Sequence, residues 1–465
     1  MKKKKFRIEK DSLGTKPVPS HVYYGIETLR AVENFPISGM RFHPEFIKAL
    51  AMIKKACAMA NRSLGRLDAR RANAVIRACQ EVISGKHHGE FVTDVLQSGA
   101  GVSAHMNANE VIANRALELL GKRRGDHAFL HSHDHVNMGQ STNDVIPTAL
   151  RIAALRLSKE FCTASKELEA ALMKKSRQFR RVVKAGRTHL QDAAPVTLGQ
   201  EFSGWATQLQ KGRERVTLMA RGLYELGIGG SAVGTGLNTS LRYRKAVIKH
   251  LKQITQFPVK ASRDLFAVMQ NDADFAAISG TLRDYALSLI QIANDLRLLS
   301  SGPNTGFGEI RLPALQPGSS IMPGKVNPVI PEMTAQVGYQ VIGNDAAIAF
   351  AAAGGECELN VMRPVIVHNL LQSFEILKNA VKVLKTRCIA GIQANPEKCR
   401  YYAENSFGIA AALNPHIGYS KAAECVKEAV RTRRTLREVV LAKGFLSEKE
   451  LARILSPENL TRPPK

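Results

Sequence analysis

A long apolar stripe in the middle of the chain constrains the fold most strongly. Its members recur at alternating spacings of three and four residues: Phe275, Ile278, Leu282, Tyr285, Leu289, Ile292, Leu296 and Leu299. This period matches one face of an α-helix of roughly seven turns. Such a face must be covered by other helices, and the stretches 152–173 and about 341–384 are long and apolar enough to do so. The sequence therefore predicts a mainly α-helical protein with a long central helical bundle.

The regions on either side of this bundle contain shorter elements. Residues 1–139 combine short helical segments with turn signals such as Pro17 and Pro36, and prolines also divide the chain beyond about residue 395. At 465 residues the chain is longer than one hydrophobic core usually allows. We therefore expect three regions: an N-terminal domain at 1–139, a central helical bundle at 140–395 and a small C-terminal helical domain at 396–465.

Hydropathy and cysteine usage exclude several classes of protein. No run of about 18 apolar residues occurs, and no apolar segment of about 7–15 residues follows the basic start MKKKK. We therefore expect a soluble cytoplasmic protein with no membrane partner. The seven cysteines form no C-x-x-C pair, which indicates reduced thiols and neither a zinc cluster nor a disulfide framework.

The charge of the chain is strongly positive. Lysine and arginine number 66 against 40 aspartates and glutamates, a formal net charge of +26. Such an excess can indicate a nucleic-acid-binding protein. Here the positive residues are spread along the chain, without a zinc finger, an RNP motif or a basic-aromatic stripe. We expect no nucleic-acid partner, and a positive field would attract a dianionic substrate.

A glycine cluster at 227–236, GIGGSAVGTG, contains the pattern G-x-G-x-x-A. A dinucleotide site would need a strand before the cluster and a helix directly after it. We predict no strand there and therefore no dinucleotide cofactor.

The segment GSSIMPGKVNP at 318–328 is the strongest candidate for chemistry. It offers two hydroxyls, glycine-rich backbone and the cation of Lys325 close to Asn327. A mobile loop with these groups can close over a carboxylate. An ordinary glycine turn is the alternative, and the physical features alone leave both interpretations open.

This segment resembles the signature loop of the aspartase/fumarase superfamily. Three more segments match the same family in order: SGAGVSAHMNANEVIANRALELLG at 98–121, GQSTNDVIPTA at 139–149 and GRTHLQDAAPVTLGQEF at 186–202. The resemblance implies a homotetrameric lyase that eliminates a group from a small dicarboxylate and releases fumarate without a cofactor. It also implies active sites that are each built from three subunits.

The resemblance assigns roles to particular residues. Ser319 would remove the proton as a base, Lys325 would stabilise charge, and His189 would pair with Glu332 at the leaving group. The residues expected to contact the substrate are Ser141, Thr142, Asn143, Thr188, Ser320, Lys325 and Asn327. The segment HSHDHVN at 131–137 suggests a metal site at first sight, but the family has a similar stretch in a secondary anion site, so we expect no metal.

Two family members fit the details of the sequence. YYGIETLRAVENF and NPVIPE look more like aspartases, whereas EFSGWA and NVMRP look more like fumarases. We therefore expect elimination of ammonia from L-aspartate, with hydration of fumarate to L-malate as the alternative. A crystallin-like structural homologue is a third interpretation, but Ser319, Lys325 and His189 are all present.

The segment SGAGVSAHMN departs from the family pattern. Val102 stands where relatives carry a threonine, Ala104 replaces a small polar residue, and His105 replaces an asparagine. Valine cannot donate the hydrogen bond that a threonine hydroxyl would give to a substrate carboxylate. Either the substrate binds weakly, or Ser103 or His105 has taken over as the donor, His105 as an imidazolium.

Overall fold

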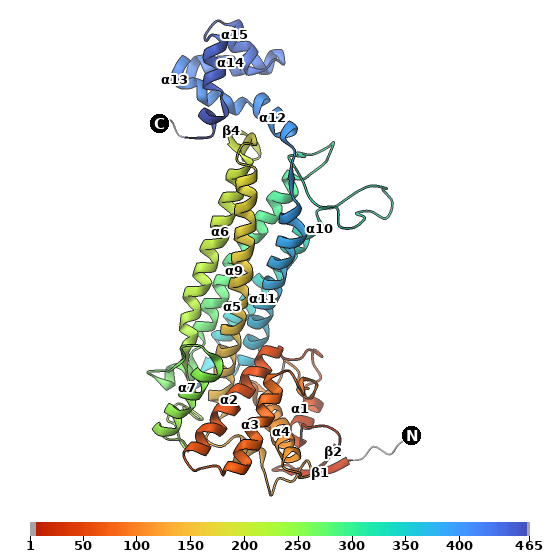
Figure 1. Ribbon diagram of the computed structural model, residues 1–465, viewed down its shortest axis with the longest axis vertical. Coiled ribbons are helices and arrows are strands. Elements are labelled where there is room, and N and C mark those ends of the chain that lie inside the picture. The colour runs from red at the N-terminus through yellow and green to blue at the C-terminus, as the bar shows by residue number, and fades with distance from the viewer. Residues whose placement is uncertain (1–5, 463–465) are drawn as a thin grey trace. The chain divides into compact units, whose positions relative to one another are not determined.

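The protein was analysed as a computed structural model, which describes residues 6–462 and is mainly α-helical (Figure 1). The chain forms two compact units, each assembled from three segments. The first unit comprises Met1–Cys162, Glu214–Asp284 and Tyr339–Leu377. The second comprises Thr163–Arg213, Tyr285–Gly338 and Lys378–Lys465. The regions expected at 1–139, 140–395 and 396–465 stay a prediction, because interleaved units do not test where separately folding regions begin.

Helices supply most of the described residues. The longer ones are α2 (Pro44–Ser63), α3 (Ala69–Ile83), α4 (Val102–Leu119), α5 (Thr142–Gln178), α6 (Leu198–Met219), α7 (Leu241–Thr255), α9 (Ala273–Leu299), α10 (Val329–Ala352), α11 (Arg363–Val383) and α14 (Tyr419–Thr432). The shorter ones are α1 (Ile26–Asn34), α8 (Leu265–Gln270), α12 (Pro396–Asn405), α13 (Asn414–Ile417), α15 (Leu436–Ala442), α16 (Glu448–Ile454) and α17 (Pro457–Leu460).

Strands occur only as short pairs in the part of the chain that the structure describes. Four antiparallel pairs are β1 (Phe6–Asp11) with β2 (Gly14–Pro19), β3 (Val183–Thr188) with β4 (Gln191–Thr197), β7 (Ile310–Arg311) with β10 (Gln393–Ala394), and β8 (Gly355–Glu356) with β9 (Leu359–Asn360). The fifth pair is parallel and joins β5 (Glu225–Leu226) to β6 (Lys260–Ala261). No strand pair is large enough to form a core of its own.

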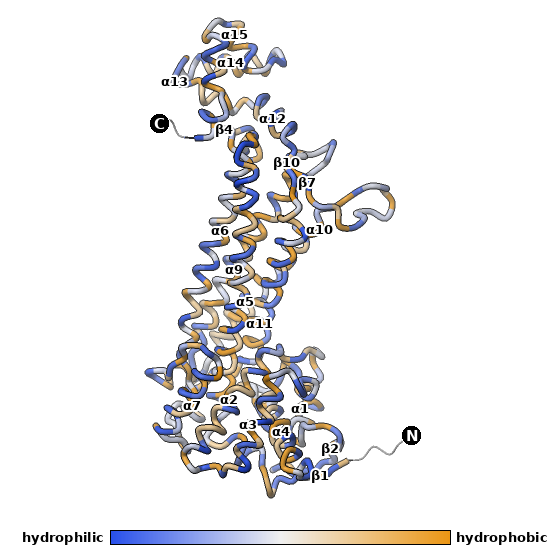
Figure 2. Tube along the Cα trace, in the orientation of Figure 1, coloured by the Kyte–Doolittle hydropathy of each residue, from blue (hydrophilic) through white to orange (hydrophobic). Residues whose placement is uncertain are grey.

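The apolar stripe lies on α9, as the sequence predicted. All eight of its members are buried, and Figure 2 shows hydrophobic and hydrophilic residues alternating along the long helices. In the first unit, Ser279 Oγ donates a hydrogen bond to Asp345 of α10 at 2.6 Å. In the second unit, the hydroxyls of Tyr285 and Ser165 of α5 lie 2.8 Å apart. The prediction of a helical bundle around this stripe is confirmed.

The apolar stretch expected at about 341–384 is not continuous. It is divided between α10 and α11, which the β8–β9 hairpin separates. Two glycines explain the break, because a Cβ at Gly355 would lie 2.7 Å from the Gln270 carbonyl oxygen and one at Gly354 would lie 2.9 Å from Met362. The close approach of the backbone therefore ends the helix where hydropathy alone suggested no end.

The first unit contains a layer of packed helices. Figure 1 shows α2, α3 and α4 side by side, and α7 also packs on α2. Helix α1 begins where buried Glu110 of α4 accepts hydrogen bonds from the backbone N–H groups of Gly25, Glu27 and Thr28. This carboxylate takes the place of a side-chain cap, since Gly25 has none to offer.

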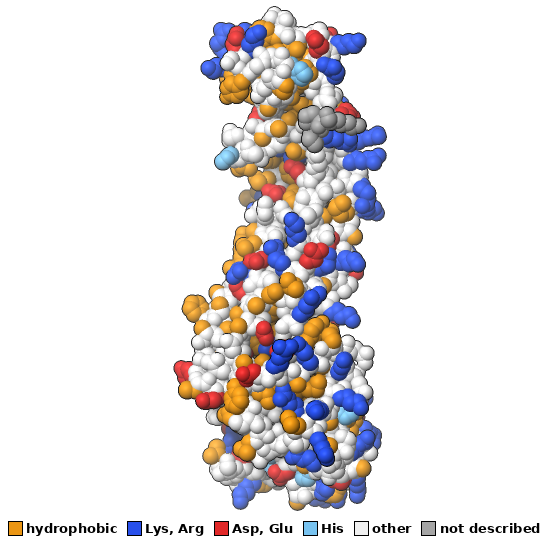
Figure 3. Space-filling view, turned by 90° about the vertical axis from the view of Figure 1, so that its left-hand side faces the viewer, with side chains coloured by type: hydrophobic (Ala, Val, Ile, Leu, Met, Phe, Trp, Pro, Cys, Tyr) orange, Lys and Arg blue, Asp and Glu red, His pale blue; other side chains and the backbone are white. Residues whose placement is uncertain are grey.

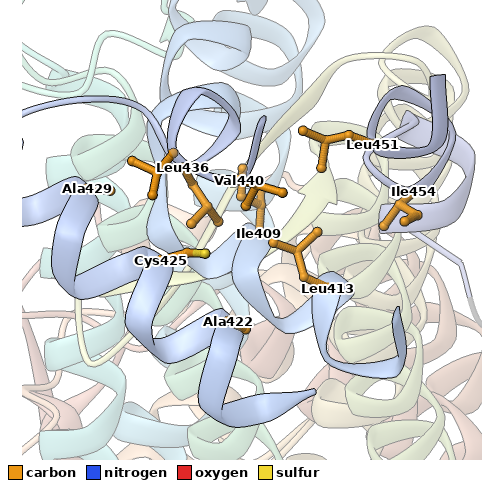
Figure 4. Packing of buried hydrophobic residues seen from close by; sticks show 10 residues of the cluster. Ile409, Leu413, Ala422, Cys425, Ala429, Leu436, Val440, Leu451 and Ile454 are labelled. Atoms are coloured by element: carbon orange, nitrogen blue, oxygen red, sulfur yellow. The ribbon is translucent and has the colours of Figure 1, made fainter. Parts of the chain in front are cut away.

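The second unit ends in a small helical cluster of its own. Its apolar centre includes Leu413, Cys425 and Val440, which Figure 4 shows pointing toward one another from η7 (Phe407–Leu413), α14 and α15. Capping boxes at Thr435 and Ser447 start α15 and α16. Short, well-capped helices can therefore pack tightly here without a long helix.

The described residues carry dispersed positive charge and free cysteines. Figure 3 shows lysine and arginine distributed along the whole visible face. Among the helices of residues 6–462, none is long and apolar enough to cross a membrane. All seven cysteines are free thiols, and five of them are buried.

Candidate active site

The loop at 318–328 lies between α9 and α10 of the second unit and is closed at its base by hydrogen bonds. The Gly318 N–H donates to the Lys325 carbonyl oxygen at 2.7 Å, and Asn327 Nδ2 donates to the Gly318 carbonyl oxygen at 2.7 Å. A Cβ at residue 318 would lie only 2.7 Å from that Lys325 oxygen. Glycine is therefore required where the two arms of the loop meet, and the closure fixes Lys325 and Asn327 beside the serines.

Ser319 is half-buried inside this loop. Its Oγ accepts hydrogen bonds from the backbone N–H groups of Ile321 at 3.2 Å and Met322 at 2.9 Å. Two donors aimed at one hydroxyl oxygen would stabilise negative charge there, as in an oxyanion hole. The arrangement thus supplies what a serine needs in order to lose its proton, whereas Ser320 is exposed.

A cavity of about 1060 Å³ in the second unit brings several candidate residues together. Lys325, Asn327 and Glu332 line it, together with Asn294, Arg297 and Arg311. Glu332 lies in the first turn of α10. The sequence analysis did not select the two arginines, because they lie outside the matched segments and no local pattern marks them. Three cations around one cavity favour an anionic ligand.

Thr188 and His189 lie at the tip of the β3–β4 hairpin. Thr188 pairs with Gln191, so His189 and Leu190 form a two-residue turn, and both have positive φ, at 56° and 60°. A turn of this kind normally uses Asn-Gly, because other L-residues are strained in the left-handed region. His189 and Leu190 are both exposed. The strain at a candidate catalytic histidine is consistent with a functional constraint.

Buried charges hold the base of this hairpin. Lys184 forms a salt bridge with Glu201 at 2.7 Å and with fully buried Glu309 at 3.0 Å. Arg187 also contacts Glu309, at 2.9 Å, and its guanidinium lies over the ring of Phe307 at 4.2 Å. The residue next to Thr188 is therefore fixed, although the turn itself is exposed. Within the described chain no hydrogen bond joins His189 to Glu332, and that pair stays a prediction.

The other candidate residues lie in the first unit, at the start of α5. Buried Asp144 accepts hydrogen bonds from the backbone N–H groups of Ser141, Gly229 and Ser231, each at 3.0 Å. Burial raises the pKa of Asp144 to about 6, while these three donors act in the opposite direction. Asn143 Nδ2 donates to the Ala232 carbonyl oxygen at 2.7 Å. The glycine cluster therefore positions Ser141, Thr142 and Asn143.

This arrangement corrects one expectation about the glycine cluster. A two-residue strand, β5, does precede it, contrary to the prediction of no strand. The cluster is followed by a further loop before α7 begins at Leu241. Its N–H groups at Gly229 and Ser231 are already occupied by Asp144. These two N–H groups therefore make a tertiary contact with a carboxylate that is distant in the sequence.

His105 connects the start of α5 to a buried lysine. Its Nδ1 lies 2.7 Å from Thr142 Oγ1, and its Nε2 lies 2.6 Å from Lys54 Nζ. The side chain is 1% exposed, and burial together with the Lys54 charge lowers its pKa well below the usual value. His105 is therefore neutral, and both ring nitrogens are occupied. This environment contradicts the expectation that His105 acts as an imidazolium, because the ring is enclosed beside a cation.

Val102 is the first residue of α4, directly after a left-handed turn at Ala100 and Gly101. Its side chain is 45% exposed, so it is not held by packing in this chain. Ser103 is buried, and its Oγ is 2.9 Å from Ser98 Oγ. The Ser103 hydroxyl therefore shares a hydrogen bond with Ser98 in which either oxygen can donate, and its role as a substrate donor stays a prediction.

The histidine segment forms a short π-helix, η3 (Ser132–Val136). His133 Nε2 lies 2.5 Å from Glu27 Oε1, and this hydrogen bond raises the pKa of His133. His131 Nδ1 lies 3.7 Å from Asp134. Among residues 6–462, no group of three or more His, Cys, Asp or Glu side chains has the arrangement of a metal site.

The predicted site residues therefore fall into two groups. Thr188, His189, Ser319, Ser320, Lys325, Asn327 and Glu332 belong to the second unit, and Val102, Ser103, His105, Ser141, Thr142 and Asn143 belong to the first. Each group gathers hydroxyl and amide side chains, but the cations that line the cavity belong to the second unit. The second unit contains every residue to which the resemblance assigns a catalytic step, whereas the residues expected to contact the substrate are divided between the two units.

Comparisons with known proteins give one consistent result. Residues 14–343 match the family described as Lyase, and residues 409–462 match Fumarase C C-terminus. Aspartate ammonia-lyase of Bacillus subtilis is 46% identical over 460 residues, which cover 99% of this chain and 97% of that protein. Fumarate hydratase class II of Halobacterium salinarum is 50% identical over 457 residues, 98% of this chain and 97% of that protein.

Solved structures agree with the sequence comparisons. The crystal structure of fumarate lyase:delta crystallin from Brucella melitensis bound to cobalt superposes with a TM-score of 0.96 at 49% identity. The superposition covers 99% of this chain and 100% of the Brucella melitensis chain. Full-length similarity of sequence and fold, together with the matched lyase family, leaves one assignment. This chain is a lyase that belongs to the aspartase/fumarase superfamily.

Proposed function

We propose that this lyase eliminates ammonia from L-aspartate to give fumarate. One observation carries the proposal: the Ser319 hydroxyl oxygen accepts hydrogen bonds from two backbone N–H groups, in a loop that also fixes Lys325. Relatives from Bacillus subtilis and Helicobacter pylori, each 46% identical over nearly the whole chain, are aspartate ammonia-lyases. The 50% identical fumarate hydratase of Halobacterium salinarum supports water as the second candidate leaving group.

In this mechanism Ser319 removes a proton from the carbon next to one substrate carboxylate. The resulting carbanion spreads its charge into that carboxylate, so the transition state carries more negative charge than the substrate. The N–H groups of Ile321 and Met322 support the serine oxygen after it loses its own proton. Lys325 and Asn327 hold the charge that develops on the substrate. His189 and Glu332 act at the departing amine.

The proposed enzyme is a homotetramer whose active sites are shared between subunits. One observation supports an assembly: α9 and α10 expose large apolar side chains. Phe350 is 83% exposed and Tyr339 57% exposed on α10, and Leu287 is 49% exposed on α9. Apolar surface of this kind is normally covered in an assembly.

The test is direct, because fumarate absorbs ultraviolet light and neither candidate substrate does so strongly. Purified protein is incubated separately with L-aspartate and with L-malate while fumarate is followed. Release from L-aspartate supports the proposal, whereas release from L-malate alone would assign the second candidate function. Release from neither would indicate a non-catalytic homologue and overturn the proposal. Mass measurement of the native protein checks the tetramer.

A further inference from the structure

Lys54 of α2 is a fully buried lysine with an unusual set of partners. Its Nζ contacts three acceptors: His105 Nε2 at 2.6 Å, Gln140 Oε1 at 2.8 Å and Asn137 Oδ1 at 2.9 Å. In residues 6–462 no salt bridge joins it to a carboxylate. A buried ammonium without an ion-pair partner is costly, and such groups occur most often where they have a function.

The direction of each hydrogen bond follows from chemistry. An ammonium has three donors and no acceptor, so His105 Nε2 must accept from Lys54. The ring proton of the neutral histidine then lies on Nδ1, which donates to Thr142 Oγ1 at 2.7 Å. The hydroxyl hydrogen of Thr142 is not used in this chain of hydrogen bonds, and Thr142 is partly exposed. The buried charge therefore orients a hydroxyl donor toward solvent at the start of α5.

We propose that Lys54 and His105 form a buried hydrogen-bond relay that directs the Thr142 hydroxyl to donate to a substrate carboxylate. The inference rests on the proposed function, because it takes Thr142 as a residue that contacts the substrate. Lys54 and His105 are positioning residues, since neither reaches the substrate. The relay also supplies a hydrogen-bond donor for the substrate carboxylate. The side chain at residue 102, a valine, cannot supply one.

Loss of the Lys54 proton reverses the relay. A neutral amine keeps two donors for Asn137 and Gln140, and its lone pair accepts a hydrogen bond from His105, whose ring proton is then on Nε2. The ring then accepts at Nδ1, and the Thr142 hydroxyl donates inward. In that state Thr142 offers no hydrogen to a carboxylate. Burial lowers the pKa of Lys54 to about 7, so the reversal occurs as the pH rises through about 7.

Other ionisable groups face this relay from the surrounding helices. They are Cys57 on α2, Cys79 on α3, Asp144 on α5 and His133 on η3. Burial raises the pKa of both thiols to about 12, which keeps them neutral between pH 6 and 8. Burial raises the pKa of Asp144 to about 6. The hydrogen bond between His133 and Glu27 raises the pKa of His133. Since the protonation of Asp144 and of His133 also depends on pH, a pH effect must be shown to act through Thr142.

Succinate is a suitable probe, because it has both carboxylates and no leaving group. Its dissociation constant is measured by calorimetry on the intact protein at pH 6 for parent, Lys54→Met, Thr142→Val and the double variant. Loss of one hydrogen bond to a charged group predicts about tenfold to hundredfold weaker binding for each single variant. The double variant should bind no more weakly than Thr142→Val alone. Additive losses would overturn the relay.

Two controls cover folding and shape. Thr142→Ser keeps the hydroxyl and should bind succinate about as the parent does. If Lys54→Met does not fold, His105→Asn serves instead, because its shorter side chain cannot span the contacts to Lys54 and Thr142. Parent-like affinity in His105→Asn would overturn the proposal.

The pH dependence gives an independent measurement. Succinate should bind the parent several-fold more weakly at pH 8 than at pH 6, and Thr142→Val should remove most of that difference. Equal affinity of the parent at both pH values, or an unchanged pH effect in Thr142→Val, would refute the relay. These outcomes do not depend on turnover. A protein that shows them but releases no fumarate keeps the relay and loses the proposed lyase reaction.

Discussion

Replacing Ser319 by alanine tests the base directly. Removal of a general base usually lowers the rate by about 10²–10⁴, which corresponds to about 3–5 kcal/mol of transition-state stabilisation. The substitution also leaves the N–H groups of Ile321 and Met322 without their acceptor. Both of these residues are exposed, so water can replace the serine oxygen at little cost to folding. We therefore expect a large loss of kcat with little loss of stability.

The assay follows fumarate release at saturating L-aspartate, with succinate affinity and native mass measured on the same samples. Ser320→Ala is the matched control, because it makes the same chemical change one residue further along the same loop. That variant should lose much less kcat than Ser319→Ala. A Ser319→Ala protein with more than about a tenth of parent activity would remove Ser319 from the role of base. Equal losses in both variants would mean that loop disturbance, and not proton transfer, causes the effect.

Three further predictions concern the shared site, the departure at residue 102 and the strained hairpin. Mixing inactive His189→Asn and Ser319→Ala proteins under subunit exchange should restore part of the activity; exchange proven by mass without recovery contradicts shared sites. Val102→Thr should lower KM for L-aspartate at least several-fold and change kcat less, because the added hydrogen bond exists before and during reaction; an unchanged KM shows that the hydroxyl is not missed. Leu190→Gly should raise the free energy of unfolding by about 0.5–1 kcal/mol, since relief of left-handed strain exceeds the entropy lost by glycine. Urea unfolding checks this, and a destabilised variant would contradict the strain.

The sequence was informative wherever a signal is local or periodic. The α9 stripe predicted a long buried helix because helical spacing is written directly in residue order, and all eight stripe residues are buried. The segment at 318–328 identified a loop whose residues contact one another over at most nine positions, as in the hydrogen bond between Asn327 and Gly318. Such short-range geometry depends mainly on local residue types.

Other features depended on contacts between distant residues. No pattern in the sequence indicated that Arg297 and Arg311 line the same cavity as Lys325, or that α10 ends before Gly355. In the glycine cluster, the backbone N–H groups of Gly229 and Ser231 donate to the distant carboxylate of Asp144. Each of these outcomes depends on which backbone approaches which side chain after folding, and hydropathy carries no such information.

The environment of His105 shows the division most clearly. Sequence alone determined that residue 105 is a histidine, and it allowed a charged ring there. Only the tertiary structure placed Lys54, which is 51 residues away, against Nε2 and Thr142, which is 37 residues away, against Nδ1. The protonation state of a histidine is set by its burial and by the charge and donors around it. Those neighbours come from two other helices, α2 and α5, so only the packed fold could decide that the ring is neutral and which of its nitrogens donates.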